Sequence, residues 1–220
     1  MIAAILTLLL AFALGSIPWG VIISRVFYKT DIRAHGSGNI GTTNAMRTLG
    51  KAGGAAVFVL DFCKGLLAGL VGLAASTWLL PGDAAADATR IIGFGWINSK
   101  VVLSLALFGC VSGHIFSPWL KFKGGKGIAV AIGCLFISFG WFWALVELGV
   151  FIVLTALTRY VSVGSIAAAV ACPFVAWVAY WGDKVALTLS LLTAVLVIWA
   201  HRQNIKRLSE GNENRIGGKK

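Results

Sequence analysis

Three segments of this 220-residue chain concentrate residue types that bind anions, and the first spans residues 35–50, HGSGNIGTTNAMRTLG. Glycines let backbone N–H groups converge on an anion, and Ser, Thr and Asn side chains add neutral donors. Arg47 can hold a phosphate with its planar fork of N–H groups. A helix that begins near Thr42 or Thr43 would direct its N-terminal amides at the same anion. The residues predicted to bind here are Gly36, Ser37, Gly38, Asn39, Thr43, Asn44 and Arg47. A glycine-rich turn is the alternative, although it requires fewer donors.

The same segment also matches the spacing of a dinucleotide-binding fingerprint. Gly36, Gly38 and Gly41 fit G-x-G-x-x-G, and Asp61 follows twenty residues later at the end of VFVLD. In a Rossmann fold, however, a strand of about six residues leads directly into the glycines. Here a much longer apolar run and the polar stretch YKTDIRAH precede them, and VFVLD continues as FCKGLLAGLVGLAAS. We therefore interpret the spacing as a coincidence.

The second segment, GHIFSPWLKFKGGKG, occupies residues 113–127 and ends directly before a long apolar run. Its paired glycines and its three lysines at a helix start predict a second phosphate-binding loop. The predicted binding residues are Lys121, Lys123, Gly124, Gly125 and Lys126. The segment is no Walker A loop, because it lacks the upstream glycine and the Ser or Thr after its lysine. Lysines beside a membrane span also follow the positive-inside rule, which is the alternative.

The third segment, HRQNIKRLSEGNENRI, covers residues 201–216. His201 and Asn204 are three residues apart on one helix face, beside the basic residues Arg202 and Lys206. The imidazole could transfer protons near neutral pH or donate to a phosphate, and the amide could orient either the histidine or the substrate. A basic helix on the lipid surface is the alternative. A smaller group, TRYVSVGS, adds Arg159 and Ser165 as candidate binding residues.

These candidates include no cysteine nucleophile, no H-E-x-x-H motif and no paired carboxylates. The four cysteines are far apart in apolar stretches, which is typical of small core residues rather than metal or disulfide sites. Cationic pockets with a single candidate base suit phosphate-bearing substrates whose leaving group is already activated. The pattern predicts neither a metal nor a cofactor.

The composition indicates the elements that must position these segments. The chain is 58% hydrophobic and 12% charged, with a mean hydropathy of +0.87, whereas soluble domains are near a quarter charged. We predict an all-α, polytopic integral membrane protein with about seven transmembrane helices, since a span needs about 20 apolar residues. The predicted spans are 2–26 with a kink at Pro18, about 53–80, about 96–116, two short helices within 128–157, 163–181 and 185–199. The two short helices are predicted to meet in a tight turn at residues 138–140. One long tilted helix over 128–157 is the alternative.

Basic residues predict the orientation of these spans. With the N-terminus outside, most of the 19 Lys and Arg residues fall in inner segments. Only Arg90, Lys100 and Lys184 fall outside, and Lys64 lies within a span. The formal charge of +11 therefore indicates a basic cytoplasmic face, and we predict no nucleic-acid partner. No Lys or Arg precedes the cleavage-like sequence at residues 11–13, which favours a retained first helix over a signal peptide.

The chain is predicted to be one domain over residues 1–220, with a short basic cytoplasmic tail over 201–220. Asp61 and Lys64 lie three residues apart on one helix face inside the membrane. We interpret them as a pair that orients helices, with a role at the site as the alternative. His114, deep in the third span, is interpreted as a hydrogen-bonded packing residue.

The three segments together resemble the signature segments of the bacterial acyl-phosphate–glycerol-3-phosphate acyltransferases, the PlsY family. They occur in the family's order and cover about a fifth of the chain, and the length and span number also agree. The family usually has Ala at the position of Thr42 and often Thr at that of Val130. Because Val130 has no hydroxyl, we leave it out of the site.

The resemblance implies transfer of an acyl group from acyl phosphate to the 1-hydroxyl of glycerol 3-phosphate, giving lysophosphatidate and phosphate. This reaction opens bacterial phospholipid synthesis without direct use of acyl-CoA or acyl carrier protein. Ser37, Arg47, His201 and Asn204 would be the residues most important for activity. Gly124, Gly125 and Lys126 match the loop that handles phosphate.

The resemblance also implies a monomer in the bacterial cytoplasmic (inner) membrane, with its active site facing the cytoplasm. Membrane lipid and an upstream enzyme that forms acyl phosphate would be its partners. Two other classes remain as alternatives. A transporter of phosphorylated or anionic solutes would have polar sites near the membrane midplane. A membrane nucleotide-binding oxidoreductase would rest on the glycine spacing alone.

Overall fold

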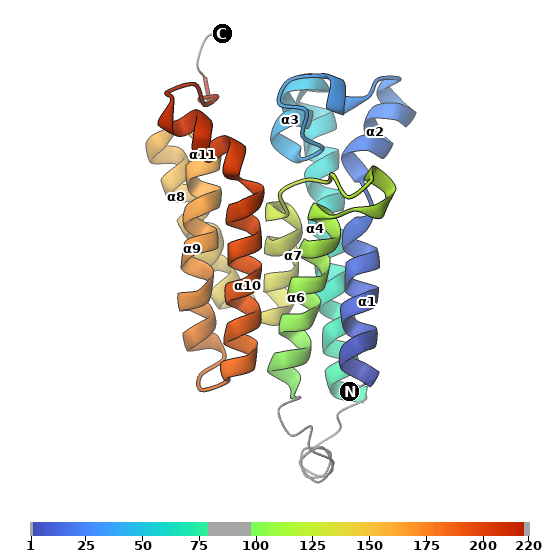
Figure 1. Ribbon diagram of the computed structural model, residues 1–220, viewed down its shortest axis with the longest axis vertical. Coiled ribbons are helices and arrows are strands. Elements are labelled where there is room, and N and C mark those ends of the chain that lie inside the picture. Colours follow the sequence, from blue (N-terminus) through green and yellow to red (C-terminus); the bar gives the residue numbers. More distant parts are fainter. Residues whose placement is uncertain (1, 79–97, 218–220) are drawn as a thin grey trace.

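The computed structural model describes residues 2–78 and 98–217, and over these ranges the chain is helical without strands (Figure 1). The α-helices are α1 (Ile2–Ser16), α2 (Trp19–Tyr28), α3 (Thr42–Thr48), α4 (Gly50–Trp78), α6 (Ser99–Ile115), α7 (Ile128–Ser138), α8 (Trp141–Thr158), α9 (Val161–Ala179), α10 (Lys184–Ala200) and α11 (Arg202–Ser209). Two 3₁₀ turns, η1 (Ile32–Ala34) and η2 (Pro118–Leu120), lie in the connections. The all-α prediction is confirmed.

Five stretches within the described residues are long and apolar enough to cross a membrane: Ile2–Tyr28, Gly50–Thr77, Ser99–Leu120, Trp141–Thr158 and Val161–Ala179. A sixth is obtained if α10 and α11, which meet at a 54° bend, are one span. Among the described residues the predicted number of seven is not confirmed, because α7, with 11 residues, is shorter than a bilayer-crossing helix requires. The predicted positions of Leu80, Arg90 and Trp96 lie outside the described residues.

Two helix breaks occur where the sequence indicated them. Pro18 separates α1 from α2, because a proline ring cannot continue the preceding hydrogen-bond ladder. The apolar run over 128–157 divides into α7 and α8, which excludes the alternative of one long helix. Gly140 has a φ of +80° at this junction, a conformation that glycine adopts without steric cost.

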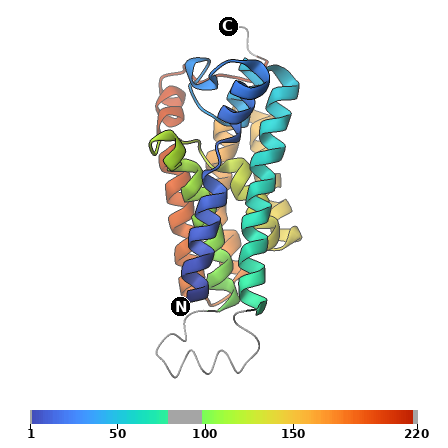
Figure 2. The same cartoon turned by 90° about the vertical axis from the view of Figure 1, so that its right-hand side faces the viewer.

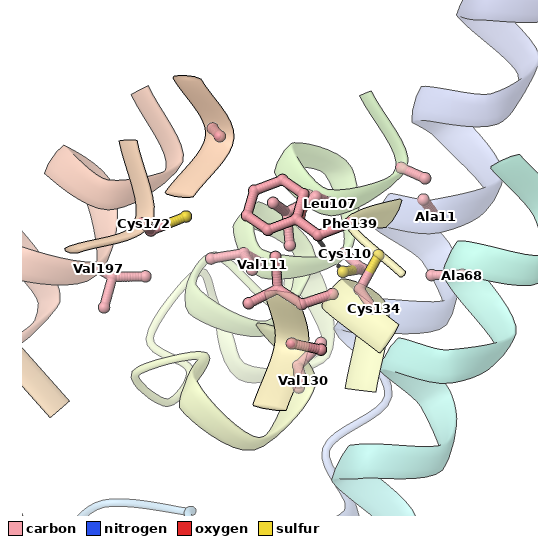
Figure 3. Packing of buried hydrophobic residues seen from close by; sticks show 14 of the residues in the cluster. Ala11, Ala68, Leu107, Cys110, Val111, Val130, Cys134, Phe139, Cys172 and Val197 are labelled. Atoms are coloured by element: carbon pink, nitrogen blue, oxygen red, sulfur yellow. Dashed lines mark hydrogen bonds between the residues drawn. The ribbon is translucent and has the colours of Figure 1, made fainter. Parts of the chain in front are cut away.

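The helices pack closely because glycines face neighbouring backbones. A Cβ at Gly15 would overlap the Cys110 carbonyl oxygen, and one at Gly133 would overlap the Phe62 carbonyl oxygen. Small residues at such positions let membrane helices approach each other. Cys110, Cys134 and Cys172 are free thiols within the apolar core (Figure 3), as the sequence analysis predicted for all four cysteines. Cys63, on α4, is only half-buried and lies outside this core.

Replacing Gly133 by alanine is expected to lower the stability of the folded protein by about 1–3 kcal/mol, because the added methyl group overpacks the contact between α4 and α7. Gly149→Ala on α8 is the matched control, since a Cβ there meets nothing within 4 Å. The control is expected to leave stability unchanged or raise it, because alanine favours helix. Thermal unfolding in detergent measures both, and equal losses would contradict the packing argument.

The two ends of the molecule differ in chemical character. Both views place the N-terminal end of α1 at one end and the C-terminal part of the chain at the other (Figures 1 and 2). α3, α11 and the connection after α2 lie at the C-terminal end, and the loop between α6 and α7 lies in the same half (Figure 1). The fold therefore brings the three polar segments towards one end of the helix bundle.

Candidate functional site

A cavity of about 590 Å³ lies where the three polar segments meet. Its lining includes most of the candidate residues: Ser37, Asn39, Thr43, Asn44, Arg47, Lys126, Ser165, His201 and Asn204. All four residues predicted to be most important for activity are among them. Side chains separated by more than 160 positions in the sequence thus line one space, which is the arrangement that a binding site requires.

The other candidates are not part of this lining: Gly36, Gly38, Lys121, Lys123, Gly124, Gly125 and Arg159. Lys121 and Lys123 are exposed, in a tight turn closed by hydrogen bonds from Phe122 N and Lys123 N to the carbonyls of Ser117 and Leu120. The positive-inside alternative describes these two lysines better than phosphate binding does. Arg159 is also exposed, and its carbonyl accepts from Ile216 N at 2.8 Å, so that it ties the C-terminal segment to the start of α9.

The first segment is held in shape by Asn44. Its Nδ2 lies 3.1 Å from the carbonyls of Ile32 and His35 and 2.8 Å from that of Asn39. Its Oδ1 accepts from the Ser37 backbone N at 2.9 Å. Because this buried amide is engaged with its own loop, Asn44 orients the segment instead of serving as the free substrate donor that the sequence suggested.

The loop before α7 also differs from the sequence-based expectation. Gly124 N donates to the Ile115 carbonyl at 2.9 Å, and Gly125 N donates to the His114 carbonyl at 3.0 Å. These carbonyls belong to the last turn of α6, which has no intrahelical donors for them. The two glycine amides are therefore used within the protein and do not face an anion. Instead, the start of α7 lines the cavity, where the amides of a first helical turn are free to bind negative charge.

Lys126 is the lysine of this loop that lines the cavity. Burial lowers its pKa to about 8, and the nearby guanidinium groups of Arg207 and Arg47 act in the same direction, whereas the Glu213 carboxylate opposes them. Two guanidinium groups and an ammonium close enough to influence one another form a strongly positive site. Such a site favours a ligand with more than one negative charge.

His201 presents an unprotonated ring nitrogen. It lies at the junction of α10 and α11, and its Nδ1 is 2.8 Å from the Val197 carbonyl oxygen. A carbonyl can only accept, so Nδ1 carries the proton and Nε2 is a hydrogen-bond acceptor. Burial lowers the pKa of His201 to about 4, which keeps the ring neutral at pH 7. The side chain can therefore accept a hydrogen bond from a hydroxyl group in the cavity.

Asn204 is oriented by Glu213, a residue of the segment that follows α11. Its Nδ2 donates to Glu213 Oε1 at 2.7 Å, and Arg207 Nε donates to Glu213 Oε2 at 2.7 Å. Burial raises the pKa of Glu213, but the hydrogen bonds from Asn204 and Arg207 outweigh this, so the group is ionised. The Asn204 Oδ1 atom is buried with no hydrogen-bond partner among the described residues, which leaves it as an acceptor for a ligand.

The polar part of the cavity continues into an apolar part between α4, α7 and α8. Its lining residues are Phe58, Ile128, Ile132, Leu148, Phe151 and Ile152. Phe58 is 41% exposed and Ile152 is 53% exposed, so the apolar part reaches the outer surface of the helix bundle. A ligand that fits both parts carries a charged head and a hydrocarbon tail.

Three cavity residues were missed by the sequence analysis: Arg207, Glu213 and Asn214. Arg207 could have been found, because it lies three residues after Asn204 on the same helix face. Glu213 follows the end of α11, where helical periodicity gives no indication of which way a side chain points.

The described part of the chain contains no group of three or more His, Cys, Asp and Glu side chains that could hold an ion. Cations, hydroxyl groups and amides dominate the polar part of the cavity instead. The fold and the site together define a multi-pass helical membrane protein with a cavity, cationic in one part and apolar in the other, at one end of its bundle.

Comparison with known proteins identifies the family. The profile of the family described as "Glycerol-3-phosphate acyltransferase" matches residues 5–211. The chain is 39% identical to a protein of that name from Rhodopseudomonas palustris, over 98% of this chain and 97% of the relative. It is 40% identical to glycerol-3-phosphate acyltransferase 2 of Bacillus anthracis, over 96% and 98%. The chain belongs to the glycerol-3-phosphate acyltransferase family.

Solved structures agree with this assignment and with the resemblance to PlsY. The crystal structure of PlsY (YgiH), an integral membrane glycerol 3-phosphate acyltransferase, in its glycerol 3-phosphate form superposes with a TM-score of 0.77. The two chains are 34% identical, with 96% of this chain and 94% of that chain covered. The lysophosphatidic acid form of the same protein gives a TM-score of 0.74.

Proposed function

We propose that this protein transfers a fatty acyl group from acyl phosphate to the 1-hydroxyl of glycerol 3-phosphate, giving lysophosphatidic acid and inorganic phosphate. One observation carries the proposal: the strongly positive part of the cavity is continuous with an apolar part between α4, α7 and α8. Membership of the family and the PlsY forms with glycerol 3-phosphate and lysophosphatidic acid support the same substrate and product. The reaction is the first step of bacterial phospholipid synthesis.

The cavity suggests a place for each substrate. Ser37, Lys126 and the start of α7 bind the phosphate of acyl phosphate, while its chain lies along Ile128 and Ile132. Arg47 and Ser165 bind the phosphate of glycerol 3-phosphate. This arrangement brings two anions together, neutralises them and aligns the hydroxyl group with the acyl carbon. Such positioning can lower the barrier by several kcal/mol.

The chemical step is an attack on an activated carbonyl. The 1-hydroxyl oxygen forms a bond to the acyl carbon, and the bond between that carbon and the phosphate oxygen breaks. His201 Nε2 accepts the hydrogen bond of the attacking 1-hydroxyl group, and Asn204 Oδ1 is a second acceptor for the glycerol moiety. A histidine with a pKa near 4 retains a proton poorly, so the departing inorganic phosphate, which is the stronger base, is the final proton acceptor.

The orientation in the membrane follows from the distribution of charge. We place the site at the cytoplasmic face of the bacterial inner membrane, with the N-terminus of the chain outside. The clustering of lysines and arginines near the cavity end supports this orientation. The chain acts as one acyltransferase domain, with residues 201–220 as a short basic cytoplasmic tail. It works as a monomer that receives acyl phosphate from an upstream enzyme.

The transporter alternative is not favoured, because the cavity's cationic residues lie at one end of the bundle rather than at the midplane.

A direct assay tests the proposed enzyme activity. Purified protein in detergent receives acyl phosphate with and without glycerol 3-phosphate, and phosphate release and lysophosphatidic acid are measured. We expect release only with the acceptor. Release without the acceptor, or none in any lipid condition, would contradict acyl transfer. Acyl-CoA as donor serves as the negative control.

The rate is expected to fall as the pH rises through about 8. Lys126 must be protonated to bind phosphate, and its pKa of about 8 means that it loses its charge there rather than above pH 10. The pH dependence of kcat/KM for acyl phosphate reports this group in the free enzyme. Lys126→Arg should remove the alkaline decline, because a guanidinium remains charged at pH 10. A decline that persists in this variant would assign it to another group.

A further inference from the structure

Three ionisable side chains of the membrane-spanning helices α4 and α6 form a cluster beside the cavity. Asp61 and Lys64 on α4 are each 2% exposed, and His114 on α6 is 3% exposed. The Lys64 Nζ lies 2.9 Å from Asp61 Oδ1, 3.0 Å from His114 Nδ1 and 2.7 Å from the Ile17 carbonyl. Asp61 and His114 also line the cavity. The Lys64 ammonium on α4 thus contacts both His114 on α6 and the break between α1 and α2.

The cluster fixes the protonation of the imidazole. An ammonium group can only donate, so His114 Nδ1 accepts and the ring proton is on Nε2. The carboxylate of Asp61 in turn holds the charge on Lys64 at 2.9 Å. Asp61 Oδ1 lies 3.9 Å from His114 Nδ1, which is beyond hydrogen-bond distance. The lysine is therefore the group that sets the position of the ring.

His114 also contacts Gly125, the residue directly before Lys126, through both its backbone and its ring. Its carbonyl accepts from Gly125 N at 3.0 Å. A Cβ on Gly125 would overlap His114 Nε2, which means that the backbone of this glycine lies directly against the ring edge. The next residue in the chain is Lys126, and α7 begins two residues after it.

We propose that His114, held by the Asp61–Lys64 pair, is a positioning residue that sets the place of Lys126 and of the first turn of α7. The proposal deepens the proposed function and rests on it, because Lys126 is there assigned to the phosphate of acyl phosphate. It also replaces the interpretation of His114 as a packing residue and of Asp61 and Lys64 as a pair that only orients helices.

The location of the cluster supports a role beyond stability. Buried ion pairs are costly to desolvate, and apolar residues of similar volume often replace them without loss of stability. Ionisable side chains inside membrane spans accordingly tend to mark functional sites. Here two of the three residues line the cavity, and the third bonds to the ring against which the glycine loop rests.

Two substitutions at His114 separate the contact of its ring with Lys64 from the contact of its ring with Gly125. His114→Asn places an amide oxygen near the position of Nδ1 and so keeps the acceptor for Lys64, but it does not reach Gly125. His114→Gln reaches the loop with a donor but lacks the acceptor for the lysine. We expect His114→Asn to lower kcat/KM for acyl phosphate at least tenfold, and His114→Gln to retain more of it. Ser104→Ala on the same helix, whose hydroxyl donates to the Lys100 carbonyl and which does not line the cavity, is the control.

A double-mutant cycle with Lys126→Ala tests whether His114 acts through Lys126. If it does, His114→Asn should cause little further loss when Lys126 is already alanine. Fully additive losses would overturn the proposal, as would His114→Asn activity equal to that of Ser104→Ala. Thermal stabilisation of each variant by inorganic phosphate provides a readout without turnover, and it should weaken with His114→Asn. Absent acyl transfer in the unaltered protein would instead overturn the proposed function.

A variant of the ion pair addresses the case in which changes at His114 prevent folding. The double substitution Asp61→Asn with Lys64→Met removes both charges and leaves neither one buried alone. We expect it to fold in detergent and to show a selective loss towards acyl phosphate that is smaller than that of His114→Asn and similar to that of His114→Gln, because both changes remove the contact between Lys64 and the ring position. A folded double variant with unaltered kcat/KM would show that the cluster does not position the loop.

Discussion

Arg47→Ala is expected to lower kcat/KM for glycerol 3-phosphate by about 10²–10³-fold, the usual cost of removing one strong donor from a preorganised anion site. Arg47 lines the cavity with an exposed side chain and makes no hydrogen bond to another side chain among the described residues. Its guanidinium is therefore available to the substrate. Steady-state kinetics with glycerol 3-phosphate varied at saturating acyl phosphate measures the effect.

Two further substitutions make this prediction specific. Arg47→Lys keeps the charge but loses the planar fork, so it should recover only part of the activity. Arg33→Ala is the matched control, because Arg33 lies in η1, in the connection that precedes α3, but is paired with Asp31 at 2.6 Å and is absent from the cavity lining. An Arg33 variant as impaired as Arg47→Ala would indicate a general effect of positive charge.

His201→Phe is expected to lower kcat by about 10²-fold or more while the protein still binds glycerol 3-phosphate, a loss within the range of general acid–base groups. The change removes the Nε2 acceptor and keeps an aromatic ring of similar size in a site that is 2% exposed. Single-turnover rates and binding of glycerol 3-phosphate, measured separately, distinguish catalysis from affinity. His201→Gln, which can still accept a hydrogen bond, should be less impaired.

Loss of glycerol 3-phosphate binding in His201→Phe with unchanged single-turnover rates would assign this histidine to substrate anchoring instead. The neighbouring Arg202→Ala provides the control, because Arg202 is exposed and packs over the Trp199 ring at 4.0 Å. Its loss should leave kcat unchanged. An equal effect in both variants would indicate a disturbance of the junction between α10 and α11.

Helix positions were the most predictable part of this protein. Long apolar runs and the breaks at Pro18 and Gly140 located the helices to within a few residues. The length of an apolar run and the positions of helix-breaking residues are both properties of the local sequence. The number of spans was less predictable. Whether α7 crosses the hydrocarbon depends on how the 11-residue helix packs against its neighbours, and composition does not encode that depth.

The residue types at the site were predicted better than their roles. Arg47 and His201 stood out because their chemistry is distinctive and their neighbours are polar. The roles of Asn44, Gly124 and Gly125 depended on which backbone groups were already paired, and this follows from tertiary structure alone. Glu213 escaped notice because its contacts with Asn204 and Arg207 cross the end of a helix.

The apolar part of the cavity opens beside Phe58 and Ile152, and this opening determines in which phase the concentration of each substrate is defined. A lipid-soluble donor that arrives sideways from the bilayer is present as a mole fraction of the membrane, whereas glycerol 3-phosphate arrives from water as a molar concentration. Diluting the bilayer with inert lipid therefore slows the first arrival and leaves the second unchanged. The product, which shares the donor's chain, can return to the bilayer without crossing water.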